Sequence, residues 1–177
     1  DMLKPDFGEQ VESRCVASNG ASGDELHNVY ALLYNRCVYE AAQRYCRSGP
    51  FLFSRAAWPG SQRYPSQWGG DPQADWGGLA ASIRGSLSWG MTGAPYFATD
   101  VGGFYGDQRD PLLYVRWAQA SVFSAHMRLH GIGPREPWTY GPEAEAAVDA
   151  ALQLRYRLIP YLRSAMRQSG ASGLPVQ

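Results

Sequence analysis

Residues 94–100 read Ala94-Pro95-Tyr96-Phe97-Ala98-Thr99-Asp100, an apolar run of strand length that ends in an acid. The glycine-containing loop Val101-Gly102-Gly103-Phe104 follows it. Asp110-Pro111 then starts a helix well, because proline at the first helical position loses no hydrogen bond. Apolar residues fall on several faces of that helix, so we expect it to be heavily buried. This part of the chain is therefore predicted to be a strand, a loop and a helix, with a charged side chain at the end of the strand.

The same order recurs along the chain. Strands are predicted at 3–7, 51–55, 94–100 and 127–130, with the start of another at 173–176. Helices are predicted from the capping box at Ser22 to Gly49, from Asp75 to 87, from Asp110 to 123, and from Pro142 to about Gln168, where Pro160 places a kink or a break. The Trp-, Gly- and Pro-rich segment 56–74 is predicted to be a loop. Alternating strands and helices with polar residues at the strand ends are typical of an α/β protein with a β/α barrel.

The chain is too short for a whole barrel of this kind. A complete barrel of eight units takes about 250 residues, whereas the chain has 177. The predicted elements make about four units and the start of a fifth. We therefore expect a single domain, 1–177, that forms a partial TIM-type β/α barrel, roughly its second half, with parallel strands and flanking helices.

A half-barrel leaves unpaired strand edges. It also exposes the apolar layer that the missing strands would cover. We expect one of two solutions. Either the chain forms a homo-oligomer in which two copies cover the open barrel edge, or its own helices repack over that face.

Composition narrows the class of protein. With 45% hydrophobic and 18% charged residues the chain has enough apolar material for one core. Equal numbers of basic and acidic residues, 16 of each, build no one-sided positive field, so no nucleic-acid partner is expected. The sequence shows neither a spanning apolar stretch nor a secretory signal, which predicts no membrane contact and a cytoplasmic location. Cys15, Cys37 and Cys46 are odd in number and lack zinc-type spacing, so we expect reduced thiols.

Two carboxylate motifs indicate the chemistry. Lys4-Pro5-Asp6-Phe7-Gly8-Glu9 is followed by Trp68-Gly69-Gly70-Asp71, and Arg55-Ala56-Ala57-Trp58-Pro59-Gly60 lies between them. Hydrolysis of a glycosidic bond requires two carboxylates of unequal environment, one as nucleophile and one as proton donor. The sequence therefore points to sugar chemistry.

These motifs carry a resemblance to a known family. Seven segments, in the family's order and over nearly the whole chain, resemble family 31 of the glycoside hydrolases: 4–9, 55–60, 68–71, Asp100-Val101-Gly102-Gly103-Phe104, Arg128-Leu129-His130, Arg135-Glu136-Pro137-Trp138 and 155–162. The lysine before Asp6 and the Phe-Gly-Glu after it look closest to the α-xylosidases of that family. Its α-glucosidases tend to carry Asp-Met-Asn-Glu at this point.

The resemblance implies a role for each acid. Asp6 matches the nucleophile, which must stay ionised; the alternative is a turn aspartate that caps the loop at Gly8. Asp71 matches the acid/base, and the flanking Trp68 and Pro72 predict a water-poor loop that favours its protonated form; the alternative is an aspartate that fixes a Gly-Gly turn. Retention by double displacement would place the two carboxyl groups about 5 to 5.5 Å apart.

The resemblance also implies the residues that contact the sugar: Lys4, Arg55, Trp68, Phe104 and His130. Arg55 suits a sugar hydroxyl and the carboxylates, or else forms a structural ion pair. Trp68 and Phe104 would be aromatic walls for the ring, or else core residues. His130 would bond the sugar next to the scissile linkage, or else sit at the rim. Asp100 is expected to orient Arg55 or the adjacent loop.

Two functions follow from these expectations. In the first, the chain is a retaining glycoside hydrolase that cleaves α-linked xylosides or glucosides, and its partner is an α-linked oligosaccharide or glycoside. In the second, it is a catalytically inactive half-barrel that acts as a folding, association or sugar-binding module. Neither function calls for a cofactor. Neither His27 nor His126 has carboxylate or cysteine neighbours at metal-ligand spacing, so no metal is expected.

Overall fold

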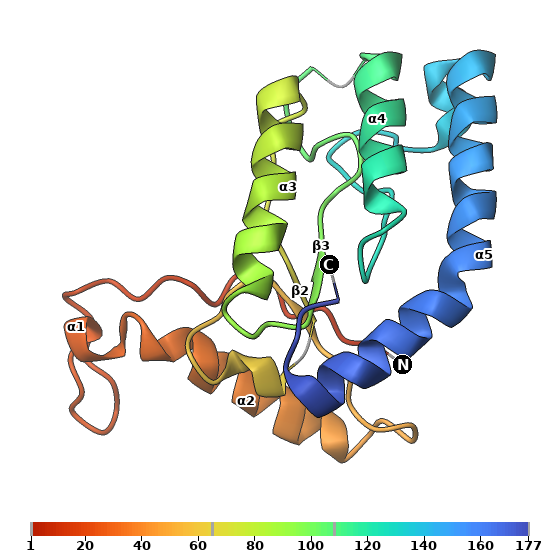
Figure 1. Ribbon diagram of the computed structural model, residues 1–177. Coiled ribbons are helices and arrows are strands. Elements are labelled where there is room, and N and C mark those ends of the chain that lie inside the picture. Colours follow the sequence, from red (N-terminus) through yellow and green to blue (C-terminus); the bar gives the residue numbers. More distant parts are fainter. Residues whose placement is uncertain (1, 65, 108, 177) are drawn as a thin grey trace. The chain divides into compact units, whose positions relative to one another are not determined.

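The computed structural model describes residues 2–64, 66–107 and 109–176 (Figure 1). The chain divides into two compact units, Asp1–Gln67 and Trp68–Gln177, and each is described by itself. The elements in chain order are α1 (Gly23–Leu26), α2 (Val29–Gln43), β1 (Phe53–Ser54), the 3-10 helix η1 (Ser61–Arg63), β2 (Ser66–Trp68), α3 (Trp76–Gly90), β3 (Tyr96–Ala98), α4 (Pro111–Ser121), the 3-10 helix η2 (Pro137–Tyr140) and α5 (Pro142–Ser172).

The strands pair in parallel and in chain order. In the first unit Leu3 bridges Leu52 in parallel, and β1 pairs with β2 in the register Phe53 to Ser66. The strand order of the sheet is β1-β2-β3, and in the second unit Asp100 bridges Arg128 in parallel. Parallel neighbours joined through helices are the pattern of a β/α barrel. Over the described ranges the sheet has three strands and does not close, which confirms the prediction of a partial barrel with flanking helices.

The strands differ in detail from the sequence prediction. β2 lies inside the segment predicted to be a loop, and all three of its residues are buried. A parallel strand that is buried on both faces usually reads as an apolar run, whereas Ser66 and Gln67 are polar, which is why this one was missed. The strands predicted at 3–7 and 127–130 are reduced to the bridges at Leu3 and Arg128. The strand predicted at 173–176 is wrong, because Gly173 ends α5 in the left-handed conformation and 174–176 have no regular structure.

The capping box at Ser22 is confirmed, but the helix it begins is short. The Ser22 side chain accepts from the Glu25 N–H, and the Glu25 carboxylate accepts from the Ser22 N–H at 2.8 Å. The segment before α1 is bonded to this turn. The Gly23 N–H donates to the Cys15 carbonyl at 2.7 Å, and His27 Nδ1 lies 3.2 Å from the Val11 carbonyl. α1 therefore ends at Leu26, and the apolar stripe continues in α2.

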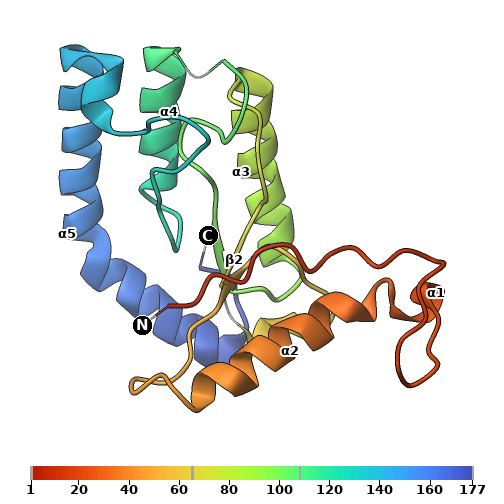
Figure 2. The same cartoon turned by 180° about the vertical axis from the view of Figure 1, so that it is seen from behind.

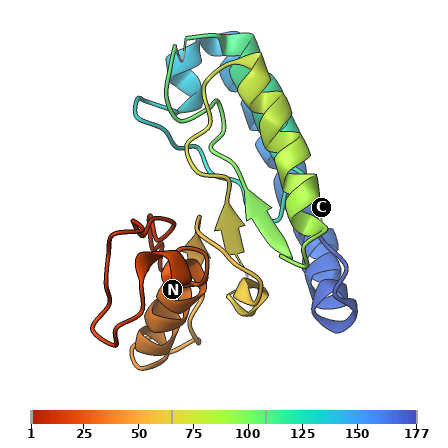
Figure 3. The same cartoon turned by 90° about the vertical axis from the view of Figure 1, so that its left-hand side faces the viewer.

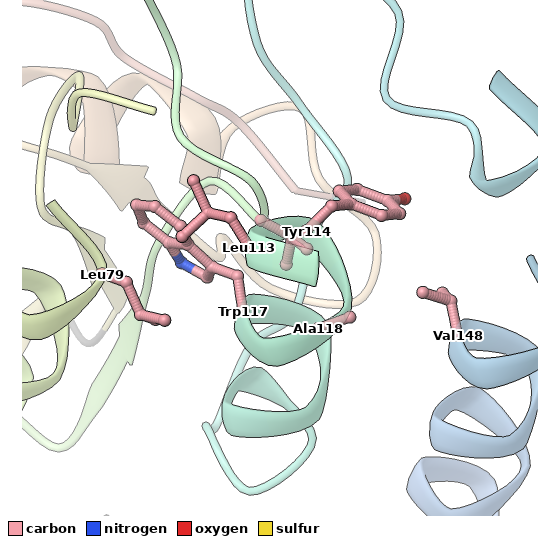
Figure 4. Close-up of a cluster of buried hydrophobic side chains, with 7 residues drawn as sticks. Leu79, Leu113, Tyr114, Trp117, Ala118 and Val148 are labelled. Carbon is pink, nitrogen blue, oxygen red and sulfur yellow. The ribbon is translucent and has the colours of Figure 1, made fainter. Parts of the chain in front are cut away.

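Helices α3, α4 and α5 lie side by side in the second unit, with α4 in the middle (Figures 1 and 2). The buried side chains of their core are Leu79, Val101, Leu113, Tyr114, Trp117, Ala118 and Val148, six of which are labelled in Figure 4. Most of them come from α4, which confirms the prediction that this helix is heavily buried. Phe123 lies beyond the end of α4 and is 60% exposed, contrary to expectation.

Helix α3 also covers β3. The two run beside each other in Figure 3, and the ring centroids of Trp89 and Phe97 are 6.2 Å apart. The Asp75 side chain caps α3 as predicted, accepting from the Gly78 N–H at 2.6 Å. Helix α5 runs through Pro160 to Ser172 and bends in its middle (Figure 1), because proline has no N–H to bond the preceding turn. Pro160 therefore places a kink and not a break.

The cap of α4 gives a test of the fold. The Asp110 side chain accepts from the N–H groups of Leu112 and Leu113 at 2.9 and 3.1 Å. Asp110→Ala should lower the free energy of unfolding by about 1 kcal/mol, measured by urea denaturation at neutral pH. The matched control is Asp107→Ala, since the ion pair of Asp107 with Arg109 is exposed and its loss should barely move the midpoint. Equal losses in the two variants would contradict the cap.

Candidate active site

Asp6 lies at the strand end of the first unit and receives three positive or polar contacts. Its Oδ2 is 3.2 Å from the Lys4 Nζ. Its Oδ1 accepts from the Phe7 N–H at 2.9 Å and lies 3.4 Å from the Arg55 Nε. The structure therefore brings Lys4, Asp6 and Arg55 together, as the sequence predicts.

Arg55 holds two carboxylates at once. Besides Asp6, it reaches Glu9, whose Oε1 is 3.0 Å from the Arg55 Nη2. The guanidinium also lies 4.4 Å from the centroid of the Phe7 ring, and the side chain is only 14% exposed. Both sequence interpretations of Arg55, a carboxylate holder and a structural ion pair, fit these contacts. Glu9 was left out of the predicted site, and its place three residues after Asp6 in the same motif is the signal that could have included it.

The backbone after Asp6 adopts an unusual conformation. Phe7 has φ 58° and Gly8 has φ 88°. A Cβ at Gly8 would lie 2.5 Å from the Tyr34 ring, so only glycine fits there. The Tyr34 hydroxyl donates to the Asp6 carbonyl at 2.8 Å. Sequence reasoning missed Tyr34, because it reads as one more residue of the helical stripe in α2.

These contacts set the charge of Asp6. Partial burial by itself would raise the pKa of Asp6, but the Phe7 N–H, the Lys4 ammonium and the Arg55 guanidinium together outweigh it. The pKa of Asp6 is therefore lowered from its ordinary value, and the carboxylate stays ionised at neutral pH. Burial, and then the neighbouring Tyr30, Asp6 and Glu9, raise the pKa of Tyr34, so its hydroxyl keeps the proton that it donates.

Asp71 belongs to the second unit and lies just after β2. The Gly69 N–H donates to the Ala98 carbonyl at 3.2 Å, and the Phe104 N–H donates to the Pro72 carbonyl at 2.6 Å. Asp71 itself is exposed, so this chain does not surround it with the water-poor loop that its neighbours predict. Trp68, which was expected to shield it, is itself buried in the second unit.

In the second unit Arg128 contacts both Trp68 and Asp100. Trp68 is 2% exposed, and the Arg128 guanidinium lies 5.0 Å from the centroid of its ring. The Arg128 Nε donates to the Asp100 Oδ1 at 2.5 Å, and Asp100 is fully buried. The core alternative for Trp68 matches this burial, while its role as a sugar wall stays a prediction. Arg128 was missed, although it stands two residues before His130 and thus on the same side of an extended segment.

Phe104 and His130 contact each other. Their ring centroids are 5.6 Å apart at an interplanar angle of 39°. Phe104 is partly buried and His130 is exposed, so the histidine is the more accessible of the two. Sugar binding by either residue, like the catalytic roles of Asp6 and Asp71, their convergence on one bond and the orienting role of Asp100 toward Arg55, stays a prediction.

The described residues also bear on metal ligands, cysteines and membrane-spanning helices. Within 2–64, 66–107 and 109–176, no group of three or more His, Cys, Asp or Glu side chains is placed to hold a metal ion. Cys15, Cys37 and Cys46 are free thiols. No helix in those same ranges is both long and apolar enough to cross a bilayer.

The charge of Asp6 can be tested directly. Lys4→Met should raise the pKa of Asp6 toward its ordinary value, since the ammonium contact is lost; a carbon-13 NMR titration of the carboxyl would measure it. Because its folded pKa is lowered, Asp6 contributes stability above its ordinary pKa that is lost as the pH falls through the folded value. This pH-dependent contribution should shrink in the variant.

The control is Arg14→Met, which removes a cation that pairs with Glu12 on the surface. It should leave the titration of Asp6 unchanged. If Lys4→Met and the unaltered chain gave the same pKa for Asp6, the proposed charge balance would be wrong.

Comparison with known proteins identifies the family. A family model described as the glycosyl hydrolases family 31 TIM-barrel domain matches residues 1–165. An α-xylosidase of Emericella nidulans is 37% identical over 179 residues, which cover 99% of this chain and 23% of that enzyme.

Solved structures agree with this match. A family 31 dextranase of Flavobacterium johnsoniae, solved with glucose, superposes with a TM-score of 0.89 at 33% identity over 97% of this chain and 24% of the other. A cycloalternan-degrading enzyme of Trueperella pyogenes, solved with a covalent intermediate, gives 0.87 at 30% identity over 97% and 25% of the two chains. The chain thus spans about a quarter of the length of these relatives. It belongs to family 31 of the glycosyl hydrolases and represents part of the TIM-barrel domain of that family.

Proposed function

We propose that this chain carries the two catalytic carboxylates of a retaining α-glycosidase, with Asp6 as nucleophile and Asp71 as acid/base. The observation that carries the proposal is the setting of Asp6. A carboxylate at a strand end, kept ionised by Lys4, Arg55 and the Phe7 N–H, meets the first requirement of a nucleophile. Asp71 stands in the second motif of the family, on an exposed segment where a proton can be exchanged.

The proposed reaction is a double displacement. Asp6 attacks the anomeric carbon of an α-linked sugar, and Asp71 gives its proton to the departing oxygen. Asp71 then takes a proton from water, which attacks the glycosyl-enzyme and releases Asp6. The covalent intermediate in the cycloalternan-degrading enzyme supports this course.

The proposed substrates are α-linked xylosides or glucosides, alone or in oligosaccharides. The Lys4-to-Glu9 motif favours xylose. The sugar ring would contact the set predicted from the sequence: Lys4, Arg55, Trp68, Phe104 and His130. Arg55 is held in place before any sugar binds, because its guanidinium is fixed by two carboxylates and an aromatic ring.

The enzyme reading is tested by activity of the purified chain on 4-nitrophenyl α-xyloside and α-glucoside. Asp6→Ala should reduce nitrophenol release to background. Asp71→Ala should reduce turnover by about 10² to 10⁴-fold, mainly because the glycosyl-enzyme then lacks its general base, since nitrophenolate leaves with little proton assistance. The first-formed sugar, observed by proton NMR, should keep the α configuration. Equal rates in the unaltered chain and both variants would dismiss the enzyme reading.

A second candidate is a half-barrel that associates without catalysis, or binds sugar without cleaving it. It is favoured by the open sheet and by a groove of about 310 Å³ in the second unit, among α3, α4 and α5. The exposed apolar side chains that line this groove are Ile83, Leu87, Phe123 and Tyr161. Such a surface on one chain is typical of an interaction site.

Association can be measured apart from activity. If two copies cover the open face, sedimentation velocity should show a dimer that dissociates on dilution, and a dye that binds apolar surface should bind more as the dimer dissociates. A monomer at every concentration, with no dye binding, would remove the homo-oligomer. A dimer without hydrolysis that depends on Asp6 would favour the non-catalytic module.

A further inference from the structure

The segment that carries Asp71 is fixed on both sides by main-chain hydrogen bonds. Before it, the Gly69 N–H donates to the Ala98 carbonyl at 3.2 Å; after it, the Phe104 N–H donates to the Pro72 carbonyl at 2.6 Å. Only Gly70 and Asp71 lie between these two anchors. The position of the Asp71 side chain therefore depends on how firmly each anchor is held.

The second anchor is part of a close contact between two loops. The Ala74 N–H donates to the Tyr105 carbonyl at 2.7 Å, and Gln73 bridges Tyr105 in parallel. A Cβ at Gly103 would lie 2.4 Å from the Ala74 Cα, so no side chain fits between the loops. Residues 103–105 thus form the wall against which 72–74 are placed.

Arg135 holds this wall from the other side. Its Nε and Nη2 donate to the Gly103 carbonyl at 3.0 and 2.6 Å, and Nη2 lies 3.4 Å from the Phe104 carbonyl. The side chain is 3% exposed, and a Cβ at Gly131 would lie 2.5 Å from its Nη2. Arg135 is itself fixed, because the Tyr114 hydroxyl donates to its carbonyl at 2.5 Å and the Tyr114 ring stacks on Tyr140 at 3.8 Å.

One peptide group joins the two sets of contacts. The carbonyl of Gly103 and the N–H of Phe104 belong to the same planar peptide unit, so fixing the direction of the carbonyl fixes the direction of the N–H. Arg135 donates to the Gly103 carbonyl, and the Phe104 N–H donates to the carbonyl of Pro72, the residue next to Asp71. We infer that Arg135 is a positioning residue for Asp71: it orients the Gly103–Phe104 peptide that anchors the acid/base segment. This inference rests on the proposed role of Asp71.

The geometry requires arginine at this position. Two nitrogens of the planar fork reach one carbonyl while a third donor, Nη1, bonds the Pro134 carbonyl at 2.9 Å. A lysine ammonium is a point charge and cannot hold a peptide plane from two nitrogens at once. Arg135→Lys therefore keeps the charge and loses the orientation.

The chain offers a matched control in Arg155. This arginine is half-buried and, like Arg135, donates to main-chain carbonyls, those of Val122, Ser124 and Ala125 after α4. Arg155→Lys should weaken the fold in a comparable way without acting on the loop that follows Asp71. A difference between the two variants then reports on position and not on stability.

The first readout is dependence on the leaving group. Methyl α-xyloside needs a proton on its departing oxygen, whereas α-xylosyl fluoride needs little proton assistance. Arg135→Lys should lower kcat/KM for the methyl xyloside by about 10-fold or more and that for the fluoride by less than about 3-fold, since only the contribution of the general acid is impaired. Arg155→Lys should change both substrates by the same factor. Equal loss on both substrates in Arg135→Lys would overturn the inference.

The second readout does not need catalysis. Amide hydrogen exchange, followed by NMR, should become faster at Phe104 and Ala74 in Arg135→Lys and stay unchanged at Gly69, the anchor on the other side. Unchanged exchange at Phe104 would overturn the positioning role whatever the activity. If Asp71→Asn lost the same factor on both substrates, or the unaltered chain hydrolysed neither, the proposed function would fail, and the exchange rates alone would decide the role of Arg135.

Discussion

Parallel pairing in chain order is the constraint on which the rest depends. It joins Leu3 to Leu52, β1 to β2, and Asp100 to Arg128, each over only one or two residues. Parallel strands end at the same edge of a sheet, so the polar residues that follow them are all carried to that edge within each unit. Such short pairings hold little by themselves, and the loops after the strands need their own means of support.

Arginines that are buried or half-buried provide much of that support. Arg55 fixes the carboxylates of Asp6 and Glu9, Arg128 covers Trp68 and bonds Asp100, and Arg135 holds the Gly103 carbonyl. Each fork satisfies oxygen atoms that the short strands leave without a ladder partner or that carry charge. One of these arginines, Arg135, is buried, and the other two are half-buried beside the loops that they contact.

Features that depend on neighbouring residues were predicted well from the sequence, and features that depend on distant parts of the chain were not. The caps at Ser22, Asp75 and Asp110 are correct because each side chain bonds an N–H two or three residues away, which the sequence displays directly. Strand β2 owes its existence to partners far along the chain, and its three buried residues show no alternation. Tyr34 reaches Asp6 from α2, so no spacing within the Lys4-to-Glu9 motif reveals it, whereas Arg128 stands in the same motif as His130 and could have been named. The family motifs placed Asp6 with Lys4 and Arg55, while Asp71 proved more exposed than its neighbours suggest.

The contacts of Asp6 and the main-chain bonds of the Asp71 segment suit different parts of the proposed reaction. The carboxylate of Asp6 is itself contacted by cations and an N–H, which keep it ionised before it attacks and stabilise it again when the glycosyl-enzyme is hydrolysed. An acid/base must lose and regain a proton in every cycle, so its place has to be kept in both charge states. Main-chain bonds at Gly69 and Pro72 fix the Asp71 segment in a way that does not depend on its proton. Support of this kind lets the side chain stay in place while its charge changes. The position of Asp71 then depends on the loop that Arg135 orients.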